Sequence, residues 1–188
     1  TASRLAGPAM VEQVHLPLPE TPDGHASSEG ASVLRDAFAK ASAAVIGPGL
    51  GDVESVRNLL QALLLTEPPL TTPVVMDADA LNALALTYRW WESLTAPAVL
   101  TPHPGEMSRL LSRAVSAIQD DRIDTAQEAA SRWGQVVVLK GAHTVIAAPG
   151  GRTSVSPFSN PALATAGTGD VLSGIIGGLL AQRVDPYH

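Results

Sequence analysis

The sequence contains no cysteine among its 188 residues. This excludes a disulfide framework, a zinc site with cysteine ligands and a thiol nucleophile. Basic residues are also few: 12 Lys and Arg stand against 18 Asp and Glu, giving a net charge of −6, and they are scattered along the chain. A protein that grips nucleic acid by its phosphates normally carries a basic face. We therefore expect no nucleic-acid partner.

Long apolar stretches and several nucleotide-binding motifs are absent as well. No segment reaches the roughly 18 consecutive apolar residues of a membrane-spanning helix, and the first residues lack an export pattern. We therefore expect a cytoplasmic protein without membrane contact. There is no Gly-Lys-Ser/Thr, no Gly-x-Gly-x-x-Gly, no Ser-His-Asp order and no His-Glu-x-x-His. The P-loop, the Rossmann fingerprint and two hydrolase sites are thus not indicated.

The patterns that are present predict a single α/β domain. Residues 1–30 are rich in Pro, Gly and Ser and predict an edge segment and a loop. After them, short apolar strands alternate with segments of helical periodicity. The expected strands are 43–46, 74–76, 98–100 and 136–139, followed by a hairpin of 144–147 and 153–155. The expected helices are 31–41, 55–65, 79–87, 105–118, 124–134 and about 170–182. Wholly apolar strands of this kind indicate a parallel sheet covered on both faces.

Glycine-rich and polar residues follow each expected parallel strand. They are Gly47-Pro48-Gly49-Leu50-Gly51, Asp77-Ala78-Asp79, Thr101-Pro102-His103-Pro104-Gly105-Glu106 and Lys140-Gly141-Ala142-His143-Thr144. In open α/β sheets the ligand binds outside the carboxyl ends of the strands. The sequence therefore predicts a ligand site at this edge.

The strongest chemical pattern is Thr165-Ala166-Gly167-Thr168-Gly169-Asp170, which precedes an apolar helix. Glycines let backbone N–H groups approach a ligand, and a helix start adds about half a positive charge. A phosphate would fit there. Asp170 then stands where a carboxylate can accept a proton from a hydroxyl. The alternative is that it only complements the helix start; the small residues and glycines before it favour the chemical interpretation.

Other polar residues leave alternatives open. Lys140 either extends to solvent or presents its ammonium group to a phosphate. His103 and His143 are ordinary loop residues unless a ligand approaches them. Asp77 and Asp79 are first of all helix-entry residues, with a magnesium role second. A carboxylate, a glycine-rich turn and one lysine together indicate phosphoryl transfer on a nucleotide.

Five segments, in order, resemble the ADP-dependent (S)-NAD(P)H-hydrate dehydratases, which are similar in fold to ribokinase. The resemblance runs from about residue 43 to 182. The segments are 47–51, 76–82, 100–106, 138–144 and 160–172. Ser159 replaces a usual glycine and Leu163 a common methionine. The resemblance implies one ribokinase-like three-layer α/β/α domain over residues 1–188, without the N-terminal strand–helix–strand portion that the family normally has.

The resemblance also implies a reaction. Hydrated NADH or NADPH would be dehydrated, with ADP as co-substrate converted to AMP and phosphate, and with Mg²⁺ accompanying the nucleotide. Phosphate leaves a carbon more readily than hydroxide does, so the nucleotide makes the elimination possible. Relatives tend to assemble, so a homo-oligomer is expected.

The resemblance assigns residues to these roles. Asp170 would be the catalytic base. The anion hole would consist of Ala166, Gly167, Thr168 and Gly169. The nucleotide would contact Lys140, Gly141, Ala142, His143, Thr144 and Gly169. The hydrated dinucleotide would contact Gly49, Gly51, His103 and Asp170. No residue is assigned as a metal ligand.

Two other functions remain open at this stage. A small-molecule kinase of the hydroxymethylpyrimidine or hydroxyethylthiazole type would use the same Asp170 and the same anion hole. Segments 101–106 and 140–144 favour the dehydratase over it. The third interpretation is a nucleotide-binding regulatory module without turnover.

Overall fold

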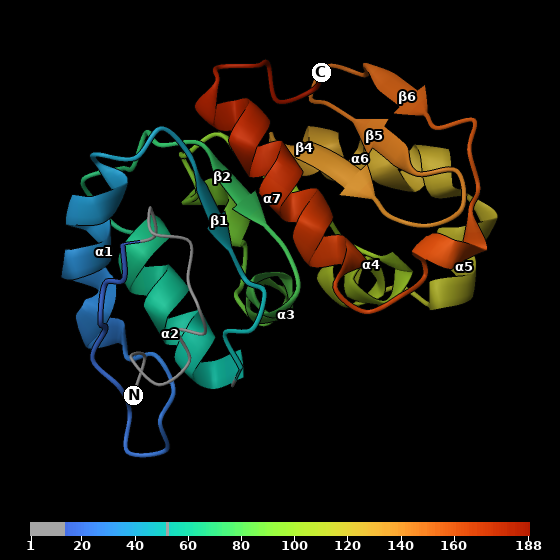
Figure 1. The fold of residues 1–188 in the computed structure, drawn as a ribbon. Helices are drawn as coiled ribbons and strands as arrows, with labels where there is room; N and C mark the ends of the chain where they lie inside the picture. The colour runs from blue at the N-terminus through green and yellow to red at the C-terminus, as the bar shows by residue number, and fades with distance from the viewer. Residues whose placement is uncertain (1–13, 52) are drawn as a thin grey trace.

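The structure, a computed structural model, describes residues 14–51 and 53–188. Six strands form one sheet in the order β1-β2-β3-β4-β5-β6 (Figure 1). The strands are β1 Ala44–Ile46, β2 Val74–Met76, β3 Ala98–Leu100, β4 Val136–Leu139, β5 Val145–Ala147 and β6 Thr153–Val155. The first four are parallel, and β5 and β6 continue the sheet as an antiparallel hairpin. The predicted sheet and its hairpin are confirmed.

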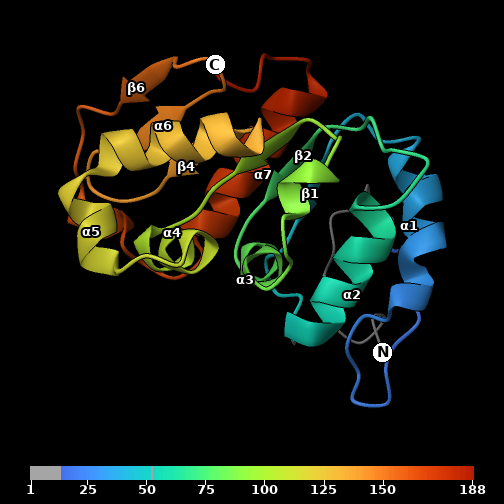
Figure 2. The same ribbon diagram turned by 180° about the vertical axis from the view of Figure 1, so that it is seen from behind.

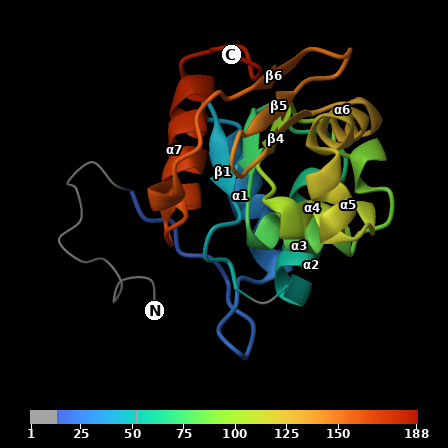
Figure 3. The ribbon, with the colours of Figure 1, turned by 90° about the vertical axis from the view of Figure 1, so that its right-hand side faces the viewer.

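Helices cover both faces of this sheet, but unequally. The α-helices are α1 Ala31–Phe38, α2 Val53–Leu64, α3 Asp79–Ala85, α4 Pro104–Leu111, α5 Val115–Asp120, α6 Arg122–Trp133 and α7 Thr168–Ala181. Short 3₁₀ turns are η2 Ser28–Gly30, η3 Trp90–Glu92 and η4 Pro161–Leu163. Seen from behind, α2, α3, α4 and α6 lie over one face (Figure 2), and the edge-on view places α7 over the other (Figure 3). The three-layer ribokinase-like class is confirmed.

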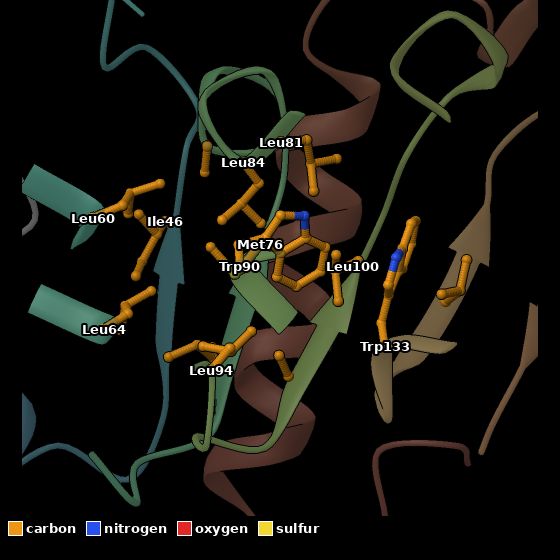
Figure 4. Close-up of a cluster of buried hydrophobic side chains, with 14 of the residues drawn as sticks. Ile46, Leu60, Leu64, Met76, Leu81, Leu84, Trp90, Leu94, Leu100 and Trp133 are labelled. Atoms are coloured by element: carbon orange, nitrogen blue, oxygen red, sulfur yellow. The ribbon is translucent and has the colours of Figure 1, made fainter. Parts of the chain in front are cut away.

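The alternation of side chains along the strands explains why each of the four parallel strands is wholly apolar. In β2, Val74 and Met76 join the large core under α2, α3 and α6, whereas Val75 joins a smaller core beneath α7. Successive residues of a strand point to opposite faces, and here both faces are covered. Trp90, Trp133 and the leucines of the helices fill the larger core (Figure 4).

One predicted helix is wrong in extent. Residues 105–118 form two helices, α4 and α5, because Ser112 adopts a left-handed conformation at φ 52°. The N–H of Arg113 then donates to the carbonyl of Ser108 at 3.1 Å and closes α4. The apolar periodicity continues across this break, so it did not show in the sequence.

At the two ends of the described chain, only the start of the last helix differs from the expectation. Residues 14–27 contain only an isolated bridge between Glu20 and Ala26, as expected of an irregular segment, and residues 1–13 lie outside the described part. The last helix begins at Thr168, so Asp170 belongs to its first turn. None of the described helices is both long and apolar enough to span a membrane.

Candidate active site at the carboxyl ends of the parallel strands

The strand register brings the four predicted loops to one edge of the sheet. The N–H of Asp77 donates to Ile46 O at 3.0 Å, that of Thr101 to Met76 O at 3.1 Å, and that of Lys140 to Pro102 O at 2.8 Å. Each strand thus extends by a hydrogen bond into the loop that follows it. The gathering of polar loops that the sequence predicted is confirmed.

Gly47 allows the first two of these loops to meet. A Cβ atom on Gly47 would stand 1.7 Å from the carbonyl oxygen of Asp77, so no side chain fits there. A hydrogen bond also joins the two loops: Asp79 Oδ2 accepts the N–H of Gly51 at 2.9 Å. Asp79 therefore acts as a tie between β1 and β2, close to its predicted helix-entry role.

The first turn of α7 is open to a ligand. Its N-cap is Gly167, in a left-handed conformation at φ 86°, and no side chain caps the helix. Uncapped N–H groups at a helix start favour an anion. Asp170 is exposed in this first turn.

Asp170 also lines a cavity of about 400 Å³ beneath it. Most of its lining is apolar, and Asp170 contributes a charged side chain. The lining residues are Leu18, Leu34, Phe38, Val45, Ile46, Gly47, Pro48, Leu50, Leu59, Leu63, Asp170 and Gly174. Gly47, Pro48 and Leu50 thus border the same space as the predicted base. The predicted substrate-binding residues Gly49, Gly51 and His103 are not among the lining residues.

Lys140 does not extend to solvent. Its Nζ donates to Asp77 Oδ1 at 2.6 Å, and its side chain is 20% exposed. The other oxygen of Asp77 accepts the hydroxyl of Ser173, in α7, also at 2.6 Å. A Cβ atom on Gly169 would lie 3.5 Å from both Lys140 Nζ and Asp77 Oδ2. The ion pair therefore sits directly below the glycine-rich turn.

A second carboxylate connects Lys140 with His103. Glu106 Oε2 lies 3.8 Å from Lys140 Nζ and accepts the N–H of His103 at 2.7 Å. In return, His103 Nδ1 accepts the N–H groups of Gly105 and Glu106, which makes a capping box for α4. Burial raises the pKa of Glu106 above its usual value, and the negative charge of Asp77 adds to this. The His103 N–H bond and the positive charge of Lys140 oppose the rise without cancelling it.

The turn between β4 and β5 is fastened by Arg122. Its Nη2 donates to Leu139 O at 2.9 Å and Lys140 O at 3.2 Å, and burial lowers the pKa of its guanidinium. Within the turn, Thr144 Oγ1 donates to Gly141 O, and His143 Nδ1 lies 3.2 Å from Ser156 O. Gly141, Ala142 and His143, which the sequence predicted to contact the nucleotide, are exposed.

Comparisons with known proteins agree on one family. The family model described as NAD(P)H-hydrate dehydratase matches residues 7–188. A bifunctional NAD(P)H-hydrate repair enzyme of Moorella thermoacetica is 46% identical over 93% of this chain and 32% of its own length. The ADP-dependent (S)-NAD(P)H-hydrate dehydratase of Bacillus subtilis is 39% identical over 84% of this chain and 57% of its own. The chain belongs to the NAD(P)H-hydrate dehydratase family.

A solved structure from this dehydratase family supports the fold directly. The ADP/ATP-dependent NAD(P)H-hydrate dehydratase of Bacillus subtilis, crystallised with ATP and Mg²⁺ and soaked with coenzyme A, matches with a TM-score of 0.66 at 39% identity. The match covers 81% of this chain and 55% of that one. The chain therefore spans little more than half of this dehydratase and about a third of the bifunctional repair enzymes.

Membership in the dehydratase family does not by itself assign a role to any single residue, but the structure shows which of the predicted site residues lie close together. Lys140, Gly169 and Asp170 come together at α7, and Glu106 joins His103 to them. Sequence reasoning missed Ser173 and Arg122, and it treated Asp77 as a helix-entry residue. Ser173 lies inside a predicted apolar helix and Arg122 lies just before one, and the partners of both are distant in the sequence, so no local signal marked them.

Proposed function

We propose that this chain catalyses the ADP-dependent dehydration of hydrated NADH or NADPH, releasing the reduced dinucleotide, AMP and phosphate. The family and the name of the Bacillus subtilis relative support this reaction. The observation that carries it is the position of Asp170, which is exposed in an uncapped first helical turn and borders the cavity.

The proposed chemistry has two steps. Asp170 accepts the proton of the substrate hydroxyl, whose oxygen bonds to the β-phosphorus of ADP while the bond from that phosphorus to the bridging oxygen breaks and AMP leaves. The carbon–oxygen bond of the phosphorylated intermediate then breaks; phosphate departs with the electron pair, and loss of a ring proton restores the double bond. A positioned base contributes about 10²–10⁴-fold in rate.

The groups around Asp170 stabilise the transferred phosphoryl group on this proposal. Backbone N–H groups of Ala166, Gly167, Thr168 and Gly169 form the anion hole, and the Lys140 ammonium group lies beneath the same turn. Each well-placed donor of this kind is worth roughly 10²–10³-fold. The nucleotide extends along the exposed turn 141–144, and Gly49, Gly51 and His103 face the dinucleotide.

Magnesium would reach this site with the nucleotide. The described residues contain no group of three or more His, Asp or Glu that could hold a metal ion. Both oxygens of Asp77 are already bonded, to Lys140 and Ser173, so Asp79 is the candidate side-chain ligand. This fits an ion held chiefly by diphosphate oxygens, which is the usual mode for Mg²⁺. When bound, the ion neutralises charge on the diphosphate.

Restoration of the reduced nicotinamide absorbance band tests the proposal. Hydrated NADH, ADP and Mg²⁺ should together restore the band, whereas omission of ADP should leave the mixture unchanged. Phosphorylation of hydroxyethylthiazole or hydroxymethylpyrimidine without any dehydration would instead establish the kinase. Nucleotide binding without either turnover would establish the regulatory module. A cytoplasmic location and a homo-oligomer stay predictions of the sequence.

A further inference from the structure

We propose that Asp77 is a positioning residue, which holds the Lys140 ammonium group beneath the first turn of α7 and so sets the grip of the site on a phosphate. The proposal rests on the proposed function, since it deepens the role of the same nucleotide site. Asp77 itself is 1% exposed, so it would act on the nucleotide through Lys140.

The hydrogen bonds of Asp77 join three separate elements. The residue follows β2, Lys140 follows β4, and Ser173 lies one turn inside α7. Oδ1 accepts from Lys140 Nζ at 2.6 Å and from the N–H of Ala78 at 2.8 Å, while Oδ2 accepts from Ser173 Oγ at 2.6 Å. Asp77 is 1% exposed and Ser173 is fully buried. The carboxylate is therefore fixed on both sides.

Stability alone is a weak reason for such an arrangement. Burial of an ammonium group and a carboxylate costs free energy of hydration, which their attraction offsets only in part, so apolar side chains of similar size often serve stability as well. The pair does, however, fix the position of a charge, because Asp77 is itself held by Ser173 and by the N–H of Ala78. The charge that is fixed is the ammonium group of Lys140.

The place of that charge is the underside of the glycine-rich turn. A Cβ atom on Gly169 would be 3.5 Å from Lys140 Nζ, an ordinary van der Waals distance, so the ammonium group lies directly against this part of the turn. An anion bound by the N–H groups of the turn would then also meet Lys140. Charge-assisted bonds of this kind are the strong ones in phosphate recognition.

Glu106 is a second carboxylate near Lys140, and it competes with Asp77 for the ammonium group. Its Oε2 is 3.8 Å from Lys140 Nζ, against 2.6 Å for Asp77 Oδ1. Without the charge of Asp77, the ammonium group would be drawn towards Glu106 and α4, away from α7. The site would keep all its groups, but the cation would no longer lie under the anion-binding turn.

Two substitutions and one control test this role. Asp77→Asn keeps the shape and removes the charge, and Ser173→Ala removes only the link to α7. Thr72→Val is the control, because Thr72 is also buried and its Oγ1 donates to the backbone O of Phe38 at 2.7 Å rather than to Asp77, Lys140 or Ser173. For each we would measure the thermal midpoint, ADP affinity by calorimetry, and kcat and KM for ADP and for hydrated NADH.

We expect Asp77→Asn to weaken ADP binding and raise the KM for ADP by about 10- to 100-fold, the range of a lost hydrogen bond to a charged group. Ser173→Ala should act in the same direction by a smaller factor, and it keeps the test available if Asp77→Asn does not fold. The KM for hydrated NADH should stay within about twofold in both. Thr72→Val should lower the thermal midpoint and leave both KM values unchanged.

The outcomes separate this inference from the proposed function. Parent-like ADP affinity in both site variants would overturn the inference even if the parent turns over. If the parent never dehydrates its substrate but the two site variants still bind ADP more weakly than the parent, the proposed function is wrong and the inference is supported. If all three variants lose affinity in step with stability, Asp77 is a structural residue and the inference is wrong.

Discussion

Asp170 in α7 and Asp124 in α6 occupy the same position, the third residue of a helix, and both are exposed. They differ in their surroundings. The side chain of Asp121 caps α6 by accepting the N–H of Asp124, whereas α7 begins at an uncapped glycine beside the cavity. Interaction with the helix dipole is available to both residues, but of the two only Asp170 borders the cavity, where the proposed base would accept a proton from the substrate hydroxyl.

This pair gives a matched test of the catalytic base. Asp170→Asn should lower the rate of dehydration by about 10²–10⁴-fold, the usual contribution of a positioned base, while ADP affinity changes by no more than a few-fold. Asp124→Asn should leave both unchanged. The measurement is kcat from the nicotinamide absorbance, with ADP affinity by calorimetry. A rate for Asp170→Asn within a few-fold of the parent would show that Asp170 is only a helix-start residue.

Glu106 predicts a pH dependence of stability with an unusual sign for a carboxyl group. Burial raises its pKa above 4.5 in the folded protein, so the folded state holds this proton more firmly than the unfolded chain does. Its contribution to stability is fully present below pH 4.5 and is lost as the pH rises through the raised value. Glu106→Gln removes this loss and keeps an acceptor for the N–H of His103.

The thermal midpoint of Glu106→Gln minus that of the parent should therefore increase as the pH rises from about 4 to 7. Differential scanning fluorimetry across this range measures it. Glu54→Gln, at a site whose side chain is 77% exposed, should show a flat difference and serves as the control. A difference for Glu106→Gln that falls with rising pH would mean that Lys140 and His103, rather than burial, dominate its environment.

At the scale of the element, α7 is the only helix on its face of the sheet among the described residues, and its packing is uneven. A Cβ atom on Gly177 would lie 2.6 Å from Val45 Cγ2, in β1, so this glycine permits the contact with the sheet. Gly178 has no heavy atom of a neighbouring segment within 4 Å of such a Cβ atom. The outer face exposes Val171, Ile175 and Leu179, at intervals of one turn.

Two adjacent glycines of α7 should consequently respond differently to alanine. Gly178→Ala should stabilise the protein by about 1 kcal/mol, because glycine is a poor helix former and the new methyl group meets nothing. That corresponds to a rise of about 2–4 °C in the thermal midpoint for a domain of this size. Gly177→Ala gains the same propensity but must displace Val45, so it should fall short of Gly178→Ala or destabilise. Equal gains would mean that α7 does not pack on β1 as described.

At the scale of the whole molecule, nucleotide binding should appear as stabilisation. A ligand that binds only the folded state at a hundred times its Kd adds about 2.7 kcal/mol to the free energy of unfolding. For a chain of this length that is roughly 5–10 °C in the thermal midpoint. ADP with Mg²⁺ should give this shift, and Asp124→Asn should retain it. No shift at millimolar ADP would contradict the proposed nucleotide site.

The strands and most helices could be predicted because local patterns determine them. Short, wholly apolar runs predicted β2, β3 and β4 to the residue, and the turn before α7 was predicted from its glycines and small residues. The break between α4 and α5 was not, because a single left-handed Ser112 leaves the apolar spacing intact. The order of the motifs was also enough to indicate the family.

Only the tertiary structure determined which polar groups meet. Asp77 and Lys140 are 63 residues apart, and Asp77 and Ser173 are 96 apart, so their contacts depend on the register of β2 with its neighbours and on the path of α7 across the sheet. No local periodicity contains that information. The sequence by itself therefore determined the elements, the glycine-rich turn and the candidate base, whereas long-range packing decided where the charge of Lys140 is held.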